Sequence, residues 1–406
     1  MQTRLSDEFS NTPEGREADS ILRACVHCGF CTATCPTYQL LGNELDGPRG
    51  RIYLIKQMLE GEAVSEKTRL HLDRCLSCRS CETTCPSGVR YGRLVDIGRE
   101  IAERKVRRGR LEAAMRYALR KLLPHPRRFA PWLRLGQRLR PLLPAALRTR
   151  VPALQTPGAW PVRMQPRRMI ALAGCVQSVA TPATNAAAAR VLDRLGIQLV
   201  EAPEAGCCGA VSHHLSAPRE GLDFMRRNID AWWPYIEQGV EAIVVTASGC
   251  GALVKEYGEL LRQDAAYAQK AARVSALARD IVEVIAAESL PRLTAHAAQR
   301  KVAFHSPCTL QHGQQLQGVV ETVLQQAGFQ LTHVSDAHLC CGSAGTYSIL
   351  QPDLSRRLLG NKLAALQQGM PDVIATANVG CQLHLATASG VPVKHWIELL
   401  DEVMQA

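Results

Sequence analysis

The sequence predicts an α/β protein in which a mainly helical, cysteine-rich N-terminal module precedes two homologous domains with parallel β-sheets. The first observation is a pair of short runs between residues 25 and 86, each with four cysteines at the same spacing. The second is an internal repeat in residues 169–406, where each copy carries four more cysteines around a Cys-Cys-Gly triplet. The third is an alternation of strand-like and helix-like segments in both copies, which is typical of a parallel sheet covered by helices.

The two N-terminal runs are Cys25-x2-Cys28-x2-Cys31-x3-Cys35-Pro36 and Cys75-x2-Cys78-x2-Cys81-x3-Cys85-Pro86. This is the spacing of bacterial ferredoxins, in which the fourth cysteine of each run binds the cluster of the other run. The pattern predicts two [4Fe-4S] clusters. Their expected ligands are Cys25, Cys28, Cys31 and Cys85 for one cluster, and Cys75, Cys78, Cys81 and Cys35 for the other. Pro36 and Pro86 favour this exchange, because proline should turn the chain away after each fourth ligand.

Structural zinc and a disulfide framework are the alternatives to iron-sulfur clusters. Zinc sites use pairs of cysteines about two to four residues apart and do not call for a third cysteine at the same gap followed by Cys-Pro. The polar start of the chain has no apolar core of a signal peptide, so the 16 cysteines are not expected in an oxidising compartment. We therefore expect a cytoplasmic protein.

Helices are expected over residues 18–24, 51–60 and 94–105, so residues 1–103 should form a helical ferredoxin-type domain with both clusters. Residues 104–168 form a basic, helical and proline-rich connector, with 18 Lys and Arg and one acid, Glu112. That segment has a charge of +17, so the rest of the chain must carry −6 to give the total of +11. The positive charge of the protein is therefore concentrated in the connector.

The connector begins with an amphipathic helix, in which an apolar stripe from Leu111 to Leu123 opposes Arg116, Arg120 and Lys121. This helix could pack on its own domains with its cations in water, or it could bind anionic lipid headgroups. No run approaches the roughly 18 apolar residues of a membrane-spanning helix, so any membrane contact would be peripheral, on the inner face of the cell membrane. A nucleic-acid partner is not expected, because the segment has no reading motif and no interleaved aromatics.

Two homologous α/β domains are expected over residues 169–295 and 296–406. In each, a strand leads to a single cysteine, then to a helix, a second strand, the Cys-Cys-Gly triplet, and a further strand before the last cysteine. The cysteines are Cys175, Cys207, Cys208 and Cys250 in the first domain, and Cys308, Cys340, Cys341 and Cys381 in the second. Because loops at the carboxyl ends of parallel strands meet at one edge of a sheet, each domain should gather its four cysteines there. A redox or metal site and a structural or vestigial role both remain open.

The order of ferredoxin module, connector and paired Cys-Cys-Gly domains resembles the family of iron-sulfur electron-transfer subunits that includes those of glycolate oxidase, anaerobic glycerol-3-phosphate dehydrogenase and heterodisulfide reductase. The blocks that carry the resemblance are HLDRCLSCRSCETTCPSGVRY, EAGCCGAV, TASGCGALVKEYG and HLCCGSAGTY, among others along nearly the whole chain. The resemblance implies partner subunits that carry FAD and oxidise glycolate to glyoxylate, and a quinone-type electron acceptor. Consistent with this division, no Gly-x-Gly-x-x-Gly follows a predicted strand to bind a dinucleotide.

The resemblance leaves other functions open. An equivalent subunit for lactate, glycerol 3-phosphate or a heterodisulfide is the near alternative, and an iron-sulfur redox sensor is a more distant one. The sequence also departs from relatives whose Cys-Cys-Gly domains hold unusual clusters, because their last cysteine belongs to a Cys-x2-Cys pair. Here Leu253 and His384 stand in the place of the second cysteine. A further iron-sulfur cofactor in these domains is therefore in doubt, more so in the first domain, because leucine cannot bind metal whereas histidine can.

Overall fold

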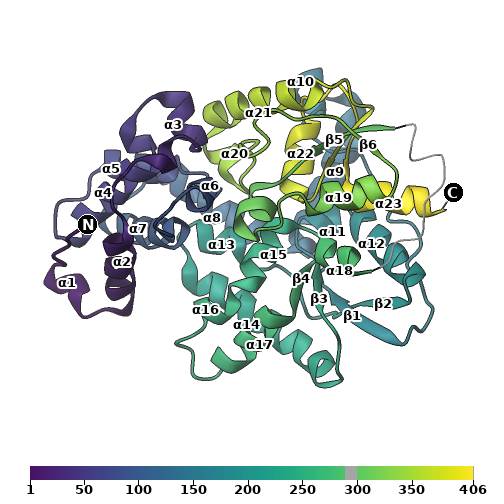
Figure 1. Ribbon diagram of the computed structural model, residues 1–406, viewed down its shortest axis with the longest axis horizontal. Coiled ribbons are helices and arrows are strands. Elements are labelled where there is room, and N and C mark those ends of the chain that lie inside the picture. The colour runs from purple at the N-terminus through teal and green to yellow at the C-terminus, as the bar shows by residue number, and fades with distance from the viewer. Residues whose placement is uncertain (289–299, 406) are drawn as a thin grey trace. The chain divides into compact units, whose positions relative to one another are not determined.

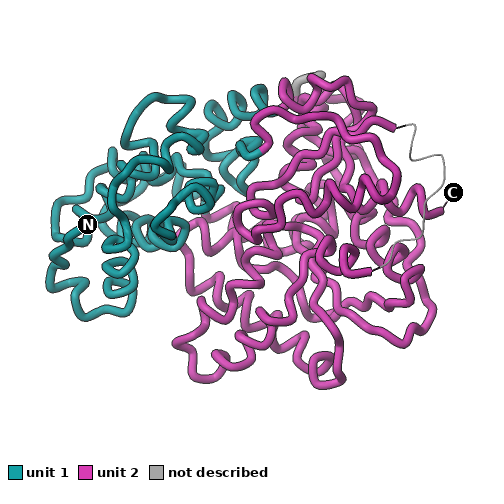
Figure 2. The backbone as a smooth tube through the Cα atoms, in the orientation of Figure 1, with its two compact units in different colours: residues 1–116, 338–362 teal, residues 117–337, 363–406 magenta. Residues whose placement is uncertain are grey.

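The computed structural model of the protein describes residues 1–288 and 300–405 (Figure 1). The chain forms two compact units (Figure 2). Unit 1 contains residues 1–116 and 338–362, and unit 2 contains residues 117–337 and 363–406. The predicted domain boundary between residues 295 and 296 lies outside the described residues, and the other predicted boundaries remain predictions.

Unit 1 is helical around the two cysteine runs. Its helices are α1 (Asp7–Ser10), α2 (Pro13–Ala24), α3 (Pro36–Leu41), α4 (Pro48–Leu59), α5 (Glu66–Asp73), α6 (Ser80–Thr83), α7 (Tyr91–Lys105) and α20 (Tyr347–Leu350), with the 3₁₀ turns η1 (Phe30–Thr32) and η2 (Glu44–Asp46). Helix α2 begins where the sequence favours it, because the Thr12 side chain accepts a hydrogen bond from the Gly15 amide and Pro13 fits the first helical position. Helices α4 and α7 cross closely at Gly98, where a Cβ atom would lie 2.6 Å from Ile55.

The connector is mostly helical. It contains α8 (Arg110–Leu122), α9 (Pro126–Leu139), the 3₁₀ turn η3 (Arg140–Leu142) and α10 (Ala145–Arg148). Pro126 starts α9 instead of only ending α8, because proline is well tolerated in the first turn of a helix. Unlike the other long helices, α9 has no buried residue.

The first α/β half has a parallel sheet in the order β2-β1-β3-β4. Its strands are β1 (Arg167–Ala171), β2 (Ile197–Glu201), β3 (Ile243–Val245) and β4 (Ala278–Asp280). The helices are α11 (Gln177–Ala180), α12 (Ala183–Arg194), α13 (Ala210–His214), α14 (Pro218–Glu237), α15 (Ser248–Lys255), α16 (Tyr257–Leu260), α17 (Ala268–Leu277) and α18 (Ile281–Ala287). Strand residues alternate between two cores: Met169 and Ala171 pack with α12 and α18, whereas Ile170 packs with α14, α15 and α17.

The second half repeats this topology with a parallel sheet in the order β6-β5-β7-β8. Its strands are β5 (Lys301–His305), β6 (Gln330–Leu331), β7 (Val373–Thr376) and β8 (Val393–His395). They alternate with the π-helical turn η5 (Thr309–Gly313) and with α19 (Val319–Gln326), α21 (Pro352–Gln367), α22 (Val379–Ala386) and α23 (Trp396–Gln405). One apolar core contains residues of both sheets and of α12, α18, α19 and α23. The two halves therefore share one core, and each is stabilised by burying apolar surface against the other.

The predicted fold class is confirmed, with a helical N-terminal region followed by two α/β repeats with parallel sheets. The sequence did not predict the edge strands β4 and β8, which have only three residues each. Within the described residues, we find no helix with both the length and the apolar character needed to span a bilayer.

Candidate metal centres

The two cysteine runs form loops with matching backbone conformations. His27 and Gly29 in the first loop have φ angles of 61° and 87°, and the equivalent Ser77 and Arg79 in the second have 50° and 61°. These left-handed residues bend the chain between consecutive cysteines, which turns the thiols of each run toward a common centre. The two loops thus share their left-handed backbone positions as well as their cysteine spacing.

Pro36 begins α3 immediately after Cys35. Its fixed φ angle suits the first helical position, where the missing amide hydrogen is not needed. Cys35 is therefore held at the N-terminal end of α3. That the chain turns away after its fourth ligand here stays a prediction.

The thiols fall into two groups of four. Burial, together with the neighbouring thiols Cys25, Cys28 and Cys85, raises the pKa of Cys31 to about 11. Burial also raises the pKa of Cys81 well above its usual value, together with Cys78, Cys75, Glu82 and Cys35. We call Cys25, Cys28, Cys31 and Cys85 the first thiol set, and Cys35, Cys75, Cys78 and Cys81 the second thiol set.

A pocket lies at the first thiol set. Its lining includes all four of these cysteines and Cys81, together with the apolar or aromatic residues Val26, Phe30, Pro48, Ile52, Pro86, Val89 and Tyr91. Burial first, and then repulsion between neighbouring ionised thiols, raises these pKa values. A positive metal centre offsets both effects. Four soft thiolates in an apolar pocket fit an iron-sulfur cluster.

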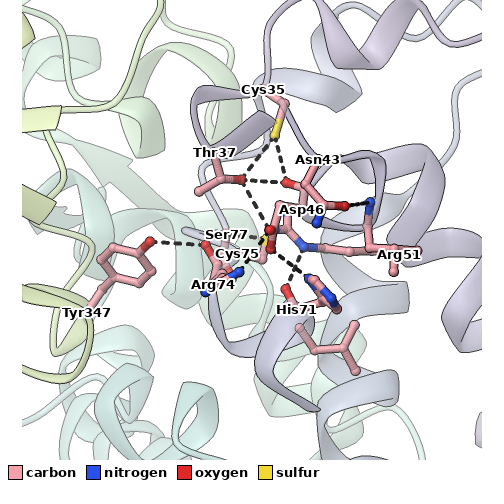
Figure 3. A network of polar contacts seen from close by, with 12 residues as sticks. Cys35, Thr37, Asn43, Asp46, Arg51, His71, Arg74, Cys75, Ser77 and Tyr347 are labelled. Atoms are coloured by element: carbon pink, nitrogen blue, oxygen red, sulfur yellow. Dashed lines mark hydrogen bonds and ion pairs between the residues drawn. The ribbon is translucent and has the colours of Figure 1, made fainter. Parts of the chain in front are cut away.

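A buried polar network contacts Cys35 and Cys75 of the second thiol set (Figure 3). Its centre is Arg51 of α4, whose side chain is 1% exposed. The Arg51 Nε atom donates to the His71 carbonyl oxygen at 2.7 Å, and Nη2 donates to Thr37 Oγ1 at 3.1 Å. Thr37 Oγ1 lies 3.3 Å from Cys35 Sγ. The arginine is thus fixed beside the thiols by neutral groups.

Cys75 has further polar neighbours. The Ser77 amide donates to Cys75 Sγ at 3.4 Å, and the Tyr91 hydroxyl donates to it at 3.6 Å. Burial alone would raise the pKa of Cys75, but Arg51 and Arg99 lower it below its usual value. Hydrogen bonds and positive charges of this kind stabilise a thiolate, which is the form that binds metal.

Sequence reasoning identified the cysteines but missed Arg51, Arg99 and Tyr91. Arg51 stands next to Ile52 at the start of the predicted helix, where an arginine is usually solvated. A buried arginine needs partners, and its hydrogen-bond partners come from α5 and α3. Only the folded arrangement reveals them.

The first Cys-Cys-Gly region brings all four of its cysteines together. The thiols of Cys175 and Cys207, of Cys207 and Cys208, and of Cys208 and Cys250 are near enough to shift one another's pKa values. Hydrogen bonding to Cys207 and burial raise the pKa of Cys175 well above its usual value. Cys175 follows β1 and Cys250 follows β3, so they flank the point at which the strand order reverses, where open α/β sheets bind ligands.

The equivalent cysteines of the second region are also buried: Cys308, Cys340, Cys341 and Cys381. Cys308 follows β5 and Cys381 follows β7, at the corresponding place in the second sheet. The Asn378 side chain donates to Cys381 Sγ at 3.4 Å, and the Gly342 amide donates to Cys340 Sγ at 3.4 Å.

The residues in place of the missing second cysteines differ in their surroundings. Leu253 is buried in the apolar core between the first sheet and its helices. His384 is half-buried in the last turn of α22. Leu253 thus serves packing, as its side chain requires, and it cannot bind a metal.

Comparisons with known proteins agree with this arrangement. A family model of the 4Fe-4S dicluster domain matches residues 21–89, and a model of the cysteine-rich domain matches residues 170–255 and 302–386. The chain is 58% identical to the glycolate oxidase iron-sulfur subunit of Escherichia coli (strain K12), over 100% of both chains. It is 31% identical to the probable glycolate oxidase iron-sulfur subunit of Bacillus subtilis (strain 168), over 93% of this chain and 91% of that one. Similarity to lactate utilization protein A of Bacillus licheniformis is 26% and covers 53% of this chain.

Proposed function

The chain belongs to the family of glycolate oxidase iron-sulfur subunits, and we propose that it carries electrons from the oxidation of glycolate to a quinone-type acceptor. Oxidation of glycolate to glyoxylate releases two electrons and two protons. A flavin accepts electrons in pairs, whereas a [4Fe-4S] cluster transfers one at a time, so the two kinds of centre complement each other. We place FAD and substrate on partner subunits of the glycolate oxidase, and single-electron transfer on this chain.

The observation that carries this proposal is the pair of thiol sets, found in a chain that is 58% identical over its full length to a named glycolate oxidase subunit. The residues of this chain have three tasks: to bind the clusters, to keep water from them, and to set their charge environment. The likeness to lactate utilization protein A covers only half of the chain. This partial likeness supports another 2-hydroxy acid as the substrate less well than the full-length likeness supports glycolate.

The first prediction separates the roles of the subunits. We expect the purified, cluster-loaded chain to show no glycolate-dependent dye reduction, because it lacks a dinucleotide-binding motif. Adding the flavin-containing partner subunits should give glycolate-dependent reduction of a quinone analogue. The same mixture with Cys78→Ser in this chain serves as the control for electron transfer. Turnover of glycolate by the chain alone would contradict the proposal.

We further propose that the connector contacts the inner face of the membrane, through α9 and not through α8. The cations of α8 have acidic partners within their own units: Arg116 Nη2 lies 3.2 Å from Asp73 Oδ1, and Arg120 and Lys121 lie 2.7 and 2.9 Å from Glu220. Leu119 is buried. These contacts support the packing alternative for α8.

Helix α9 and the turn η3 present an exposed, basic and apolar face. Exposed Trp132, Leu135, Leu139 and Leu142 follow one another at helical spacing. The exposed arginines Arg127, Arg134 and Arg138 lie along the adjoining edge of the helix. No acidic residue stands between Glu112 and Asp193 in the sequence. Apolar side chains beside unpaired cations suit an interface with anionic lipid headgroups.

The second prediction tests this surface. Changing Arg127, Arg134 and Arg138 to glutamate should abolish sedimentation of the chain with vesicles that contain anionic lipid. Each cation near such a surface contributes roughly 1 kcal/mol, and the effect weakens as salt screens the charges. The wild-type chain should therefore sediment at low salt and be released at high salt.

The matched control makes the same charge change elsewhere, at the exposed Arg262, Arg279 and Arg356. This variant has the same net charge and should still bind. Trp132→Ala should weaken binding without changing the melting temperature, because the side chain is 67% exposed. Equal loss of binding in both triple variants would show that net charge matters and that α9 does not.

A further inference from the structure

The two thiol sets have different charge environments, although their loops have the same backbone. The second set faces permanent positive charge: Arg51 and Arg99 act on Cys75, and Arg51 also acts on Cys35. Arg51 is fully buried, so water screens its charge poorly. The difference between the sets is therefore electrostatic.

Acidic groups near the second set do not cancel this charge. Asp46 is buried beside Arg51, and its nearest Oδ1 atom is 3.7 Å from Arg51 Nη2. However, Arg74 lies closer to this carboxylate, at 3.0 Å from Oδ2, and His71 Nδ1 lies 2.9 Å from Oδ1. Asp46 is thus compensated by Arg74. Glu82 lies near Cys81. Because the single carboxylate of Asp46 faces both Arg51 and Arg74, a net positive charge remains beside the second set.

Arg99 is also held in place beside the second set. Its guanidinium donates to the Leu72 carbonyl oxygen at 3.1 and 2.9 Å, to the Cys75 carbonyl oxygen at 2.5 Å and to Ser77 Oγ at 2.8 Å. None of these acceptors is a carboxylate. Asp73 also acts on Arg99, but it is already paired with Arg108 and Arg116, so it balances the positive charge of Arg99 only in part.

The arginine beside the first thiol set, Arg49, has a weaker electrostatic effect on its thiols. Arg49 acts on Cys31, but its side chain is 37% exposed and lies 2.5 Å from the Glu44 carboxylate. Exposure and pairing both reduce the field of Arg49 at the thiols. Cys28 of this set is itself exposed, whereas Cys35, Cys75 and Cys81 of the second set are buried.

We propose that Arg51 and Arg99 make the centre held by the second thiol set the one with the higher reduction potential, so that it accepts the electron from the centre held by the first set. This inference rests on the proposed ligand sets and deepens the proposed electron-transfer function. Each transferred electron adds one negative charge, which nearby fixed positive charge stabilises. One centre is oxidised by one electron as the other is reduced, and no proton is needed. Arg51 and Arg99 are positioning residues of this step and not ligands.

The test is a potentiometric titration of the full chain loaded with iron and sulfide, followed by EPR of the reduced centres. Cys28→Ser alters the first set and assigns the two signals. In the wild-type chain, the signal of the second set should appear at the higher potential. Arg51→Met should lower the potential of that signal by at least the equivalent of a tenfold change in its ratio of reduced to oxidised form, which is 59 mV for one electron.

Three variants complete the design. Arg51→Lys keeps the charge and should restore most of the potential. Arg99→Met should shift the second signal in the same direction as Arg51→Met, and it decides the question if Arg51→Met prevents assembly of the centre. Arg49→Met is the matched control, because it makes the same change on the same helix beside the first set, and it should leave both signals almost unchanged.

Several outcomes would overturn the inference. One is a wild-type chain whose first set titrates at the higher potential. Another is an unchanged second signal in Arg99→Met and Arg51→Met, or an equal shift of both signals. The titration needs neither glycolate nor a partner subunit, so its result is independent of the proposed substrate.

Discussion

Replacing Cys35 with serine is expected to destroy or severely disturb the centre formed by the second cysteine run, and to leave the centre of its own run intact. The reason is that Cys35 lies among Cys75, Cys78 and Cys81, where it acts on Cys81. The iron content should fall from about eight to about four per chain, and electron transfer from the flavin subunits should stop. Iron and sulfide analysis with EPR of the reduced chain measures this loss.

The reciprocal variant is the control for this prediction. Cys85→Ser removes the corresponding residue of the second run and should damage the centre of Cys25, Cys28 and Cys31. The two variants should therefore lose opposite EPR signals. Damage by Cys35→Ser confined to the first signal would refute the exchange of ligands. Wild-type iron clearly above about eight would point to additional metal at the Cys-Cys-Gly thiols.

The second large effect is expected at Asp401, whose carboxylate joins the two α/β halves. It lies on α23, is 4% exposed, and accepts from Arg190 Nη2 of α12 at 2.6 Å and from Arg194 Nη1 at 2.9 Å. Asp401→Ala would leave Arg190 and Arg194 without this carboxylate at the contact between α12 and α23. Removing one partner of a buried ion pair costs about 3 to 5 kcal/mol, so the free energy of unfolding should fall by that order.

Asp223→Ala provides the comparison within the same unit. Asp223 also pairs with an arginine, Arg226 at 2.7 Å, but its side chain is 72% exposed. Loss of such a surface pair should change the free energy of unfolding by less than about 1 kcal/mol. Chemical denaturation of both variants, followed by circular dichroism, would measure the difference. Equal destabilisation would show that the contact between α12 and α23 does not depend on Asp401.

The sequence predicted the cysteine grouping and the α/β repeats because both depend on local spacing. Helices such as α19 and strands such as β1 have enough residues to show their period, whereas β4 and β8 do not. The prediction also identified the basic connector. It left packing and lipid binding both open for α8. The ion pairs of α8 support packing there, whereas α9 has an exposed apolar face.

The electrostatic difference between the thiol sets could not be predicted from the cysteine runs. The two motifs have the same cysteine and proline spacing, and the loops repeat even the left-handed positions. The difference comes from Arg51 and Arg99, which belong to two separate helices. Their effect depends on burial and on the partners of Asp46, and neither is visible in a motif.

The placement of Cys85 among Cys25, Cys28 and Cys31 also has a consequence for biosynthesis. A ribosome that has released only the first cysteine run has not yet supplied the last ligand of either centre, because the second set needs Cys81 and the first set needs Cys85. Each cluster would then act as a covalent cross-link that closes a long loop and removes conformational entropy from the unfolded chain. Metal insertion and folding of the N-terminal module should therefore follow the synthesis of Cys85, and iron starvation should expose the nascent module to proteases.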